Sequence, residues 1–163
     1  MKRIEIAGEN YLGAWKHTRT ACRGVVLRGD SLLLSHEART GQMMIPGGGL
    51  EAGETAADCC RREVAEETGV LVRVGECALE IDEYYEDWKY VSLYFLCEPE
   101  GACERRLTER EEEAGMEPRW LSLDAAVAEF ATHADYAATD EMRRGLYLRE
   151  YTALRALTDP SFA

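Results

Sequence analysis

The first third of the chain contains three short hydrophobic runs separated by turn-forming residues. Arg19–Arg28 and Ser31–Ser35 are rich in Val and Leu, and Gly29-Asp30 between them is typical of a β-hairpin turn. Met43–Ile45 predicts a further short strand, which runs into the glycines Gly47–Gly49. Because glycine has no side chain, we expect these glycines to form a loop whose backbone can approach a ligand closely.

A helix with a clear beginning and end follows the glycines. Thr55 is a suitable N-cap, the segment from Thr55 to Thr68 contains no Pro or Gly, and Gly69 suits the left-handed conformation that often ends a helix. Apolar residues at three- and four-residue steps form a narrow stripe along it, namely Ala56, Ala57, Cys60 and Val64. The pattern therefore predicts a helix that packs through this stripe.

The rest of the chain alternates between strand-like and helix-like segments. Strands are expected at Val70–Val74, Ala78–Asp82, Lys89–Cys97 and Trp120–Ser122, and helices at about Asp124–Phe130 and Asp140–Leu157. The last helix is expected to bury an apolar face formed by Met142, Leu146, Tyr147, Leu154 and Leu157. The chain shows no repeat, low-complexity segment or linker, so residues 1–163 are expected to form one α/β domain with a mixed sheet between helices.

Three glutamates share one side of the predicted helix at 55–68. Glu63 and Glu67 are four residues apart and Glu66 is three from Glu63, so their carboxylates are neighbours that repel one another. A hard divalent cation such as Mg²⁺ or Mn²⁺, which prefers oxygen ligands, would explain this clustering. Taken alone the spacing also suits a solvated acidic face, but the preceding glycine run favours a metal site.

The segment from Gly48 to Val70 resembles the signature of the Nudix hydrolase superfamily. Nine specified positions match, namely Gly48, Glu54, Arg62, Glu63, Val64, Glu66, Glu67, Gly69 and Val70. The resemblance implies a Nudix-type α/β/α sandwich with a mixed sheet. It also implies a metal-dependent hydrolase that cleaves a diphosphate bond in a nucleoside diphosphate linked to another moiety. A nucleoside triphosphate, a dinucleoside polyphosphate or a nucleotide sugar all remain open, and so does a non-catalytic module of the same fold that senses a nucleotide.

The same resemblance implies roles for individual residues. The Gly47 carbonyl, Glu63, Glu66 and Glu67 are expected to bind Mg²⁺ or Mn²⁺, and Glu54 and Arg62 to form a structural ion pair between loop and helix. Glu66 and Glu67 are also expected to take part in catalysis. A general base can come from the signature or from the acidic loop at 108–120, where we assign it to Glu113, with Glu111 and Glu112 as alternatives.

Candidate substrate-binding residues lie outside the signature. Tyr85 and Trp88 could stack against a nucleobase, and Arg19 and Arg23 near the first strand could hold a phosphate or an aromatic ring. Core packing or turn chemistry is the competing explanation for each of them. We therefore treat these four residues as hypotheses that depend on where the fold places them.

Composition and charge exclude several classes of partner. A net charge of −12 would repel nucleic acids and anionic membranes, whereas a small phosphate substrate that carries a cation is still attracted to a carboxylate-lined site. No apolar run is long enough to span a bilayer, and the six cysteines show no zinc-type spacing. We expect a cytoplasmic enzyme with reduced cysteines that acts on a small nucleotide-type molecule, and a homodimer is compatible with the resemblance.

Overall fold

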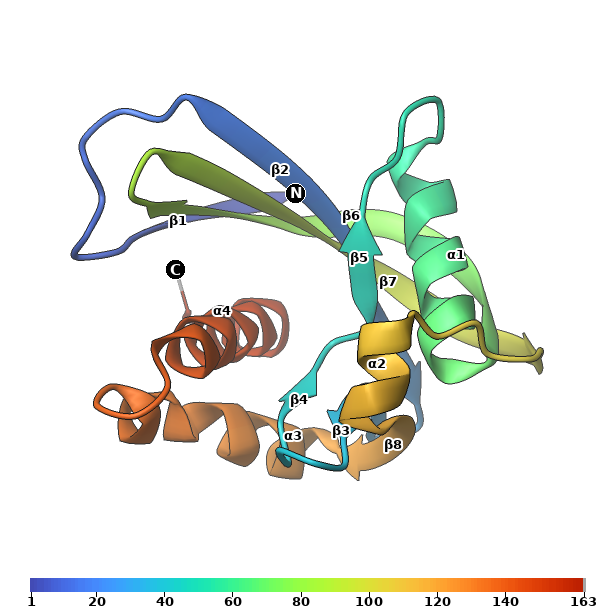
Figure 1. The fold of residues 1–163 in the computed structure, drawn as a ribbon. Helices are drawn as coiled ribbons and strands as arrows, with labels where there is room; N and C mark the ends of the chain where they lie inside the picture. Colours follow the sequence, from blue (N-terminus) through green and yellow to red (C-terminus); the bar gives the residue numbers. More distant parts are fainter. Residues whose placement is uncertain (163) are drawn as a thin grey trace.

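A mixed eight-stranded sheet with helices on both faces forms the centre of the molecule, as the computed structural model shows for residues 1–162 (Figure 1). The strands are β1 (Lys2–Ala7), β2 (His17–Arg28), β3 (Ser31–Glu37), β4 (Met43–Met44), β5 (Gly47–Gly49), β6 (Val70–Tyr85), β7 (Trp88–Ala102) and β8 (Met116–Ser122). The helices are α1 (Ala56–Thr68), α2 (Glu109–Ala114), α3 (Leu123–Phe130), the 3₁₀ helix η1 (Ala131–Tyr136) and α4 (Glu141–Thr158). None of these helices is long and apolar enough to cross a membrane.

The sheet combines parallel and antiparallel neighbours. Its order is β1-β6-β7-β2-β3-β4, with β5 paired to β2 and β8 paired to β3. The pairs β1–β6 and β2–β7 are parallel, and the other pairs are antiparallel. The predicted fold class, an α/β/α sandwich around a mixed sheet, is confirmed.

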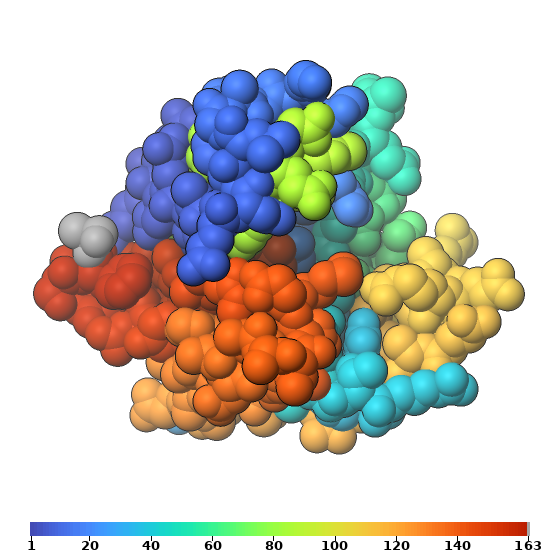
Figure 2. All heavy atoms as spheres, turned by 60° about the vertical axis from the view of Figure 1, so that its left-hand side comes forward, coloured from blue at the N-terminus to red at the C-terminus, as the bar shows by residue number. Residues whose placement is uncertain are grey.

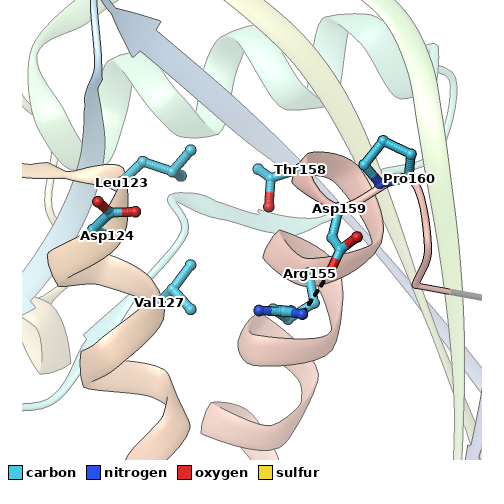
Figure 3. Close-up of a pocket in the computed structure, with 7 residues that line it drawn as sticks. All are labelled: Leu123, Asp124, Val127, Arg155, Thr158, Asp159 and Pro160. Carbon is cyan, nitrogen blue, oxygen red and sulfur yellow. Dashed lines mark hydrogen bonds and ion pairs between the residues drawn. The ribbon is translucent and has the colours of Figure 1, made fainter.

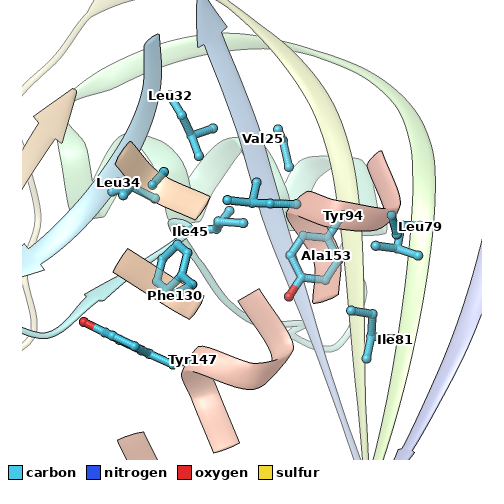
Figure 4. Close-up of a cluster of buried hydrophobic side chains, with 13 residues drawn as sticks. Val25, Leu32, Leu34, Ile45, Leu79, Ile81, Tyr94, Phe130, Tyr147 and Ala153 are labelled. Carbon is cyan, nitrogen blue, oxygen red and sulfur yellow. The ribbon is translucent and has the colours of Figure 1, made fainter. Parts of the chain in front are cut away.

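Two hydrophobic clusters hold the helices against opposite faces of the sheet. Successive residues of a strand point to opposite faces, and β2 follows this rule: Val26 packs with α1, whereas Val25 packs with α4. The cluster on the α1 side comprises Cys22, Val26, Leu33, Cys59, Cys60, Val64, Val72, Phe95 and Cys97. Residues of the larger cluster on the α4 side are drawn in Figure 4 and include Val25, Leu32, Leu34, Ile45, Leu79, Ile81, Tyr94, Phe130, Tyr147 and Ala153.

The predicted helix after the glycines is confirmed together with both of its ends. Thr55 caps the N-terminus, since its hydroxyl accepts a 3.1 Å hydrogen bond from the backbone N–H of Asp58. Gly69 ends the helix with φ 72°, a conformation that glycine adopts without steric cost. The predicted stripe also packs as expected, because Cys60 and Val64 are fully buried against β2.

Several details of the predicted elements are wrong. The two strands predicted at Val70–Val74 and Ala78–Asp82 are one bulged strand, β6, in which Gly75 lies so close to β7 that a Cβ there would be 2.8 Å from a backbone oxygen. Met142 is 88% exposed, so it does not belong to the buried face of α4. The glycines Gly47–Gly49 form strand β5 rather than a loop.

Three elements are absent from the sequence predictions, namely β1, α2 and η1. Strand β1 precedes the first predicted strand and pairs with β6 along its whole length. Helix α2 lies within the loop predicted at 108–120, where Thr108 and Glu111 form a reciprocal capping box. Strand β1 depends on a partner that is distant in sequence, whereas the capping box of α2 is a local signal that was not recognised.

Candidate active site

The three glutamates of α1 lie at different depths. Glu67 is only 4% exposed, whereas the side chains of Glu63 and Glu66 are 16% and 34% exposed. The helix therefore presents a graded acidic face that runs from the protein interior to solvent. We call Glu63, Glu66 and Glu67 the acidic face of α1.

Arg62 connects this acidic face to the segment that precedes the helix. Its guanidinium donates to both carboxylate oxygens of Glu54, at 3.1 and 2.7 Å, so the ion pair is present and bidentate. It also donates to Glu63 at 2.8 Å, to Glu66 at 3.4 Å and to the carbonyl of Gly49 at 3.2 Å. Hydrogen bonds from Arg62 lower the pKa of Glu54 to about 2.

Strand β5 brings its backbone directly against the acidic face. A Cβ at Gly48 would lie 2.4 Å from the carboxylate carbon of Glu63, so this position has no room for a side chain. Gly47 is similarly close to β2, where a Cβ would lie 2.3 Å from the carbonyl oxygen of Cys22. The glycines are therefore explained by close contact on both sides of β5.

The hydrogen-bond pattern of β5 shows where its free backbone groups point. The carbonyl of Pro46 accepts a 2.9 Å backbone hydrogen bond from β2, and the N–H of Leu50 donates one of 2.9 Å to β2. Because alternate residues of an antiparallel strand face opposite edges, Gly47 and Gly49 turn their N–H and C=O groups away from β2. The N–H of Gly47 accordingly donates to Glu67 at 3.2 Å, and its carbonyl lies along the same edge.

Glu67 is held by two donors from different strands. The hydroxyl of Ser35 in β3 donates to Glu67 Oε2 at 2.9 Å, and the N–H of Gly47 donates to the same oxygen. Burial raises the pKa of Glu67 to about 8, and the charges of Glu111 and Glu63 contribute in the same direction. Burial also raises the pKa of Glu63, although Arg62 opposes this shift.

The acidic loop contributes one glutamate that influences the acidic face of α1. Glu111 raises the pKa values of both Glu63 and Glu67 through its charge, and its side chain accepts the capping-box hydrogen bond from Thr108 at 2.9 Å. Glu113, the residue assigned from the sequence, is exposed at the end of α2. The position of α2 therefore favours Glu111 within this loop, while the assignment to Glu113 stays a prediction.

The donor atoms at this site suit a hard divalent cation. The Gly47 carbonyl and the three glutamates offer only oxygen, and burial raises the pKa values of Glu63 and Glu67, so a bound cation would favour their charged forms. Within residues 1–162 no three acidic, His or Cys side chains already enclose an ion position. Arg62 instead holds one oxygen each of Glu63 and Glu66, so these two side chains would have to turn toward a cation.

The four candidate substrate-binding residues lie on the face of the sheet that is turned toward α4. The strand register pairs Tyr85 with Trp88, Trp88 with His17, and Arg19 with Tyr90, and directly paired residues share a face. The ring of Trp88 stacks with that of His17 and with that of Tyr90, at centroid distances of 4.8 and 5.5 Å. His17, Trp88 and Tyr90 therefore form an aromatic row at the tip of the sheet.

The two arginines lie at different depths on the same face. The exposed Arg19 is next to β5, since a Cβ on Gly49 would be 3.6 Å from its guanidinium. Arg23 is buried, donates to the Ile45 carbonyl at 3.4 Å, and its Nε has no partner within residues 1–162. The Tyr85 hydroxyl likewise has no partner in the described part of the chain. Of the two arginines, only Arg19 is therefore exposed beside β5.

Two hollows in the surface lie apart from the acidic face. One of about 390 Å³ separates α3 from the end of α4 (Figure 3), and there Arg155 is already paired with Asp159 at 2.6 Å. The other, of about 280 Å³, lies between the tip of the sheet and the start of α4, and Tyr85 and Arg144 line it. Figure 2 shows this side, where the loop before β2 (blue) and the β6–β7 turn (green) lie next to η1 and α4 (orange).

Sequence reasoning missed Ser35 and a buried charge network under α4. Ser35 is the polar residue that ends the apolar run of the predicted strand, and this position was a signal that could have found it. In the network, Arg149 donates to Glu150 at 2.9 Å and lies 3.5 Å from Glu83, and Tyr94 donates to Glu150 at 2.7 Å. The network joins α4 to Glu83 of β6 and Tyr94 of β7, so no local pattern could have indicated the whole association.

Comparisons with known proteins identify relatives in sequence and in fold. A MutT-like protein from Streptomyces ambofaciens is 40% identical over 89 residues, which cover 53% of this chain and 55% of that protein. The chain therefore matches only about half the length of this curated relative.

Solved structures with low sequence identity share the fold. The E. coli ORF135 protein has a TM-score of 0.57 and 19% identity, with 91% of this chain and 98% of that chain covered. An ADP-ribose pyrophosphatase from Streptococcus suis has a TM-score of 0.53 and 16% identity, over 89% and 96% of the two chains. A MutT NUDIX hydrolase from Burkholderia pseudomallei has a TM-score of 0.53 and 20% identity, over 67% and 86%.

The model of the NUDIX domain matches residues 17–142, which include β5, the whole of α1 and the acidic loop. This match covers most of the chain and contains every residue of the site described above. The chain therefore belongs to the Nudix family.

Proposed function

We propose that this protein is a metal-dependent hydrolase that cleaves a diphosphate bond in a nucleoside diphosphate linked to another moiety. One observation carries the proposal: the buried carboxylate of Glu67 is fixed beside the free backbone edge of a glycine strand, at the inner end of an acidic helix face. A structural helix gains nothing from such an arrangement, because like charges on neighbouring turns repel. Family membership supports the reaction class.

The Gly47 carbonyl, Glu63, Glu66 and Glu67 are the groups that would hold Mg²⁺ or Mn²⁺. When bound, the ion would neutralise diphosphate charge and help to activate water for attack at phosphorus. Arg62 holds Glu63 and Glu66 near this position and is itself anchored by Glu54. The Glu54–Arg62 pair thus supports the site without contacting substrate.

A general base must accept a proton from the attacking water. Within the signature, Glu66 has the most exposed of the three glutamate side chains, at 34%, and so can reach solvent. In the acidic loop, Glu111 is better placed than Glu113, because its charge is felt by Glu63 and Glu67. We rank Glu111 before Glu113, with Glu66 as the candidate within the signature.

The α4-facing side of the sheet is the proposed place for the rest of the substrate. The stacked rings of Trp88 and Tyr90 offer a flat surface for a nucleobase, and Arg19 lies between this surface and β5, where it can contact phosphate. Tyr85 and the buried Arg23 line the same face. A nucleoside triphosphate, a dinucleoside polyphosphate and a nucleotide sugar each fit this description.

The competing proposal is a nucleotide-sensing module that does not catalyse a reaction. We propose a cytoplasmic location for the protein under either function. Every glutamate of the signature is present, which favours the enzyme. Purified protein should be incubated with a panel of the three nucleotide classes, with Mg²⁺ or with EDTA, and products separated by ion-exchange chromatography. The proposal expects Mg²⁺-dependent release of a nucleoside monophosphate or its partner phosphate from at least one class. Tight binding without products across the panel would support the sensing module instead.

A further inference from the structure

The two oxygens of Glu67 have different surroundings. Oε2 accepts from the Ser35 hydroxyl at 2.9 Å and from the Gly47 N–H at 3.2 Å, whereas Oε1 has no hydrogen bond within residues 1–162. Ser35 and Glu67 are 2% and 4% exposed, so water does not compete freely for these contacts. The carboxylate is therefore held by one oxygen and leaves the other available.

The position of Ser35 follows from the alternation of β3. Leu33 belongs to the cluster on the α1 side, and Ser35 is two residues further along the strand, so its side chain also points toward α1. A Ser hydroxyl has one proton, and here that proton is used on Glu67. At this position an apolar side chain would only pack against α1, whereas Ser35 makes a directed hydrogen bond at the inner end of the acidic face.

We propose that Ser35 is a positioning residue that fixes Glu67 so that Oε1 is the oxygen offered to the divalent cation. This inference rests on the metal site of the proposed function. With Ser35 and Gly47 both bound to Oε2, rotation of the carboxylate would break two hydrogen bonds. The carbonyl of Gly47 lies on the same strand edge as its N–H, so the fixed carboxylate and this carbonyl form one preorganised half of an all-oxygen site.

Ser35→Ala tests the proposal, because it removes the hydroxyl without adding atoms. Mn²⁺ affinity should be measured without substrate by electron paramagnetic resonance, and we expect it to weaken by roughly 10- to 100-fold, the usual effect of losing a partner of a metal ligand. Turnover should show a lower kcat at saturating Mn²⁺, with KM for the nucleotide little changed. Thr152→Val is the matched control: Thr152 is also buried and donates to the Leu148 carbonyl at 2.7 Å, but it lies in α4. It should leave Mn²⁺ affinity unchanged.

A double-mutant cycle separates positioning from a general loss of structure. If Ser35 acts through Glu67, Ser35→Ala should have little further effect on Mn²⁺ affinity in a Glu67→Gln background. An equal loss in both backgrounds, or Mn²⁺ affinity in Ser35→Ala within twofold of the wild type, would overturn the inference. Wild-type protein that binds Mn²⁺ but cleaves no nucleotide would refute the proposed hydrolase while leaving this inference intact.

Discussion

The glutamates of the site differ in which groups donate hydrogen bonds to them. Arg62 is shared among Glu54, Glu63 and Glu66, whereas the deeper Glu67 receives its hydrogen bonds from a hydroxyl and a backbone N–H. Glu67 therefore keeps a buried carboxylate that no arginine neutralises directly. This difference makes Glu67 the residue most dependent on a cation for its charge.

The loop glutamates can be separated by substitution to glutamine. Glu111→Gln should lower the single-turnover rate by roughly a hundredfold, the usual scale for a general base, while Gln can still complete the capping box with Thr108. Glu113→Gln is the matched control on the same helix and should be nearly silent. A large loss in Glu113→Gln alone would instead support the residue that the sequence favoured. If both variants are silent, the base lies in the signature, and Glu66 becomes the first candidate.

At the scale of elements, the local signals of α1 were recognised, the local capping box of α2 was missed, and pairings between distant segments could not be predicted. The ends of α1 follow from Thr55 and Gly69, whose effects extend over one turn, and both were found. The glycines Gly47–Gly49 form a strand because β2 supplies its hydrogen bonds, and no pattern within the glycine run indicates that partner. The signature similarly located the acidic face but could not show that Glu67 is buried or that Ser35 binds it.

The pairing of the segment before α1 with the helix predicts a pH dependence of stability. Because Arg62 lowers the folded-state pKa of Glu54 to about 2, Glu54 contributes stability above its unfolded-state pKa, and this contribution is lost as the pH falls toward 2. Urea unfolding of the wild type and Glu54→Gln should therefore converge between about pH 5 and pH 2. Glu51→Gln, whose side chain is 71% exposed and 3.9 Å from Arg62, is the control and should follow the wild type. Parallel curves for wild type and Glu54→Gln would contradict the role of the pair.

At the scale of the whole molecule, β2 links the two halves of the site. One of its faces packs against α1, the other carries Arg19 and Arg23, and its edge pairs with β5. This arrangement depends on the parallel pairing of β2 with β7, which joins segments about 70 residues apart in sequence, from His17–Trp88 to Val26–Cys97. The four substrate-binding candidates could be named from residue type, but only this register shows that they share a face.

The contact of α1 with β2 is tight enough to predict a stability effect. A Cβ at Gly24 would lie 2.6 Å from a methyl group of Val64, so Gly24→Ala should force the helix away from the sheet. We expect a loss of about 1–3 kcal/mol in the free energy of unfolding, as is usual for overpacking. Gly101→Ala in β7, where the nearest atom would be 3.5 Å away, should be neutral or slightly stabilising. Urea unfolding of both variants measures this, and equal stabilities would contradict the packing described here.

We propose that the buried carboxylate of Glu67 binds a cation that hydrolysis requires and that folding does not. Glu67→Gln keeps an oxygen that can accept from Ser35 and Gly47 but removes the charge. The most direct measurement is its single-turnover rate on the best substrate with saturating Mg²⁺, alongside thermal melts without metal. We predict a rate lower by about 10²- to 10⁴-fold, because the neutral amide cannot replace a carboxylate ligand. The metal-free melting temperature should be no lower than that of the wild type, because burial disfavours the charged form of Glu67 and an amide avoids this cost. Hydrolysis at a near wild-type rate would contradict the account.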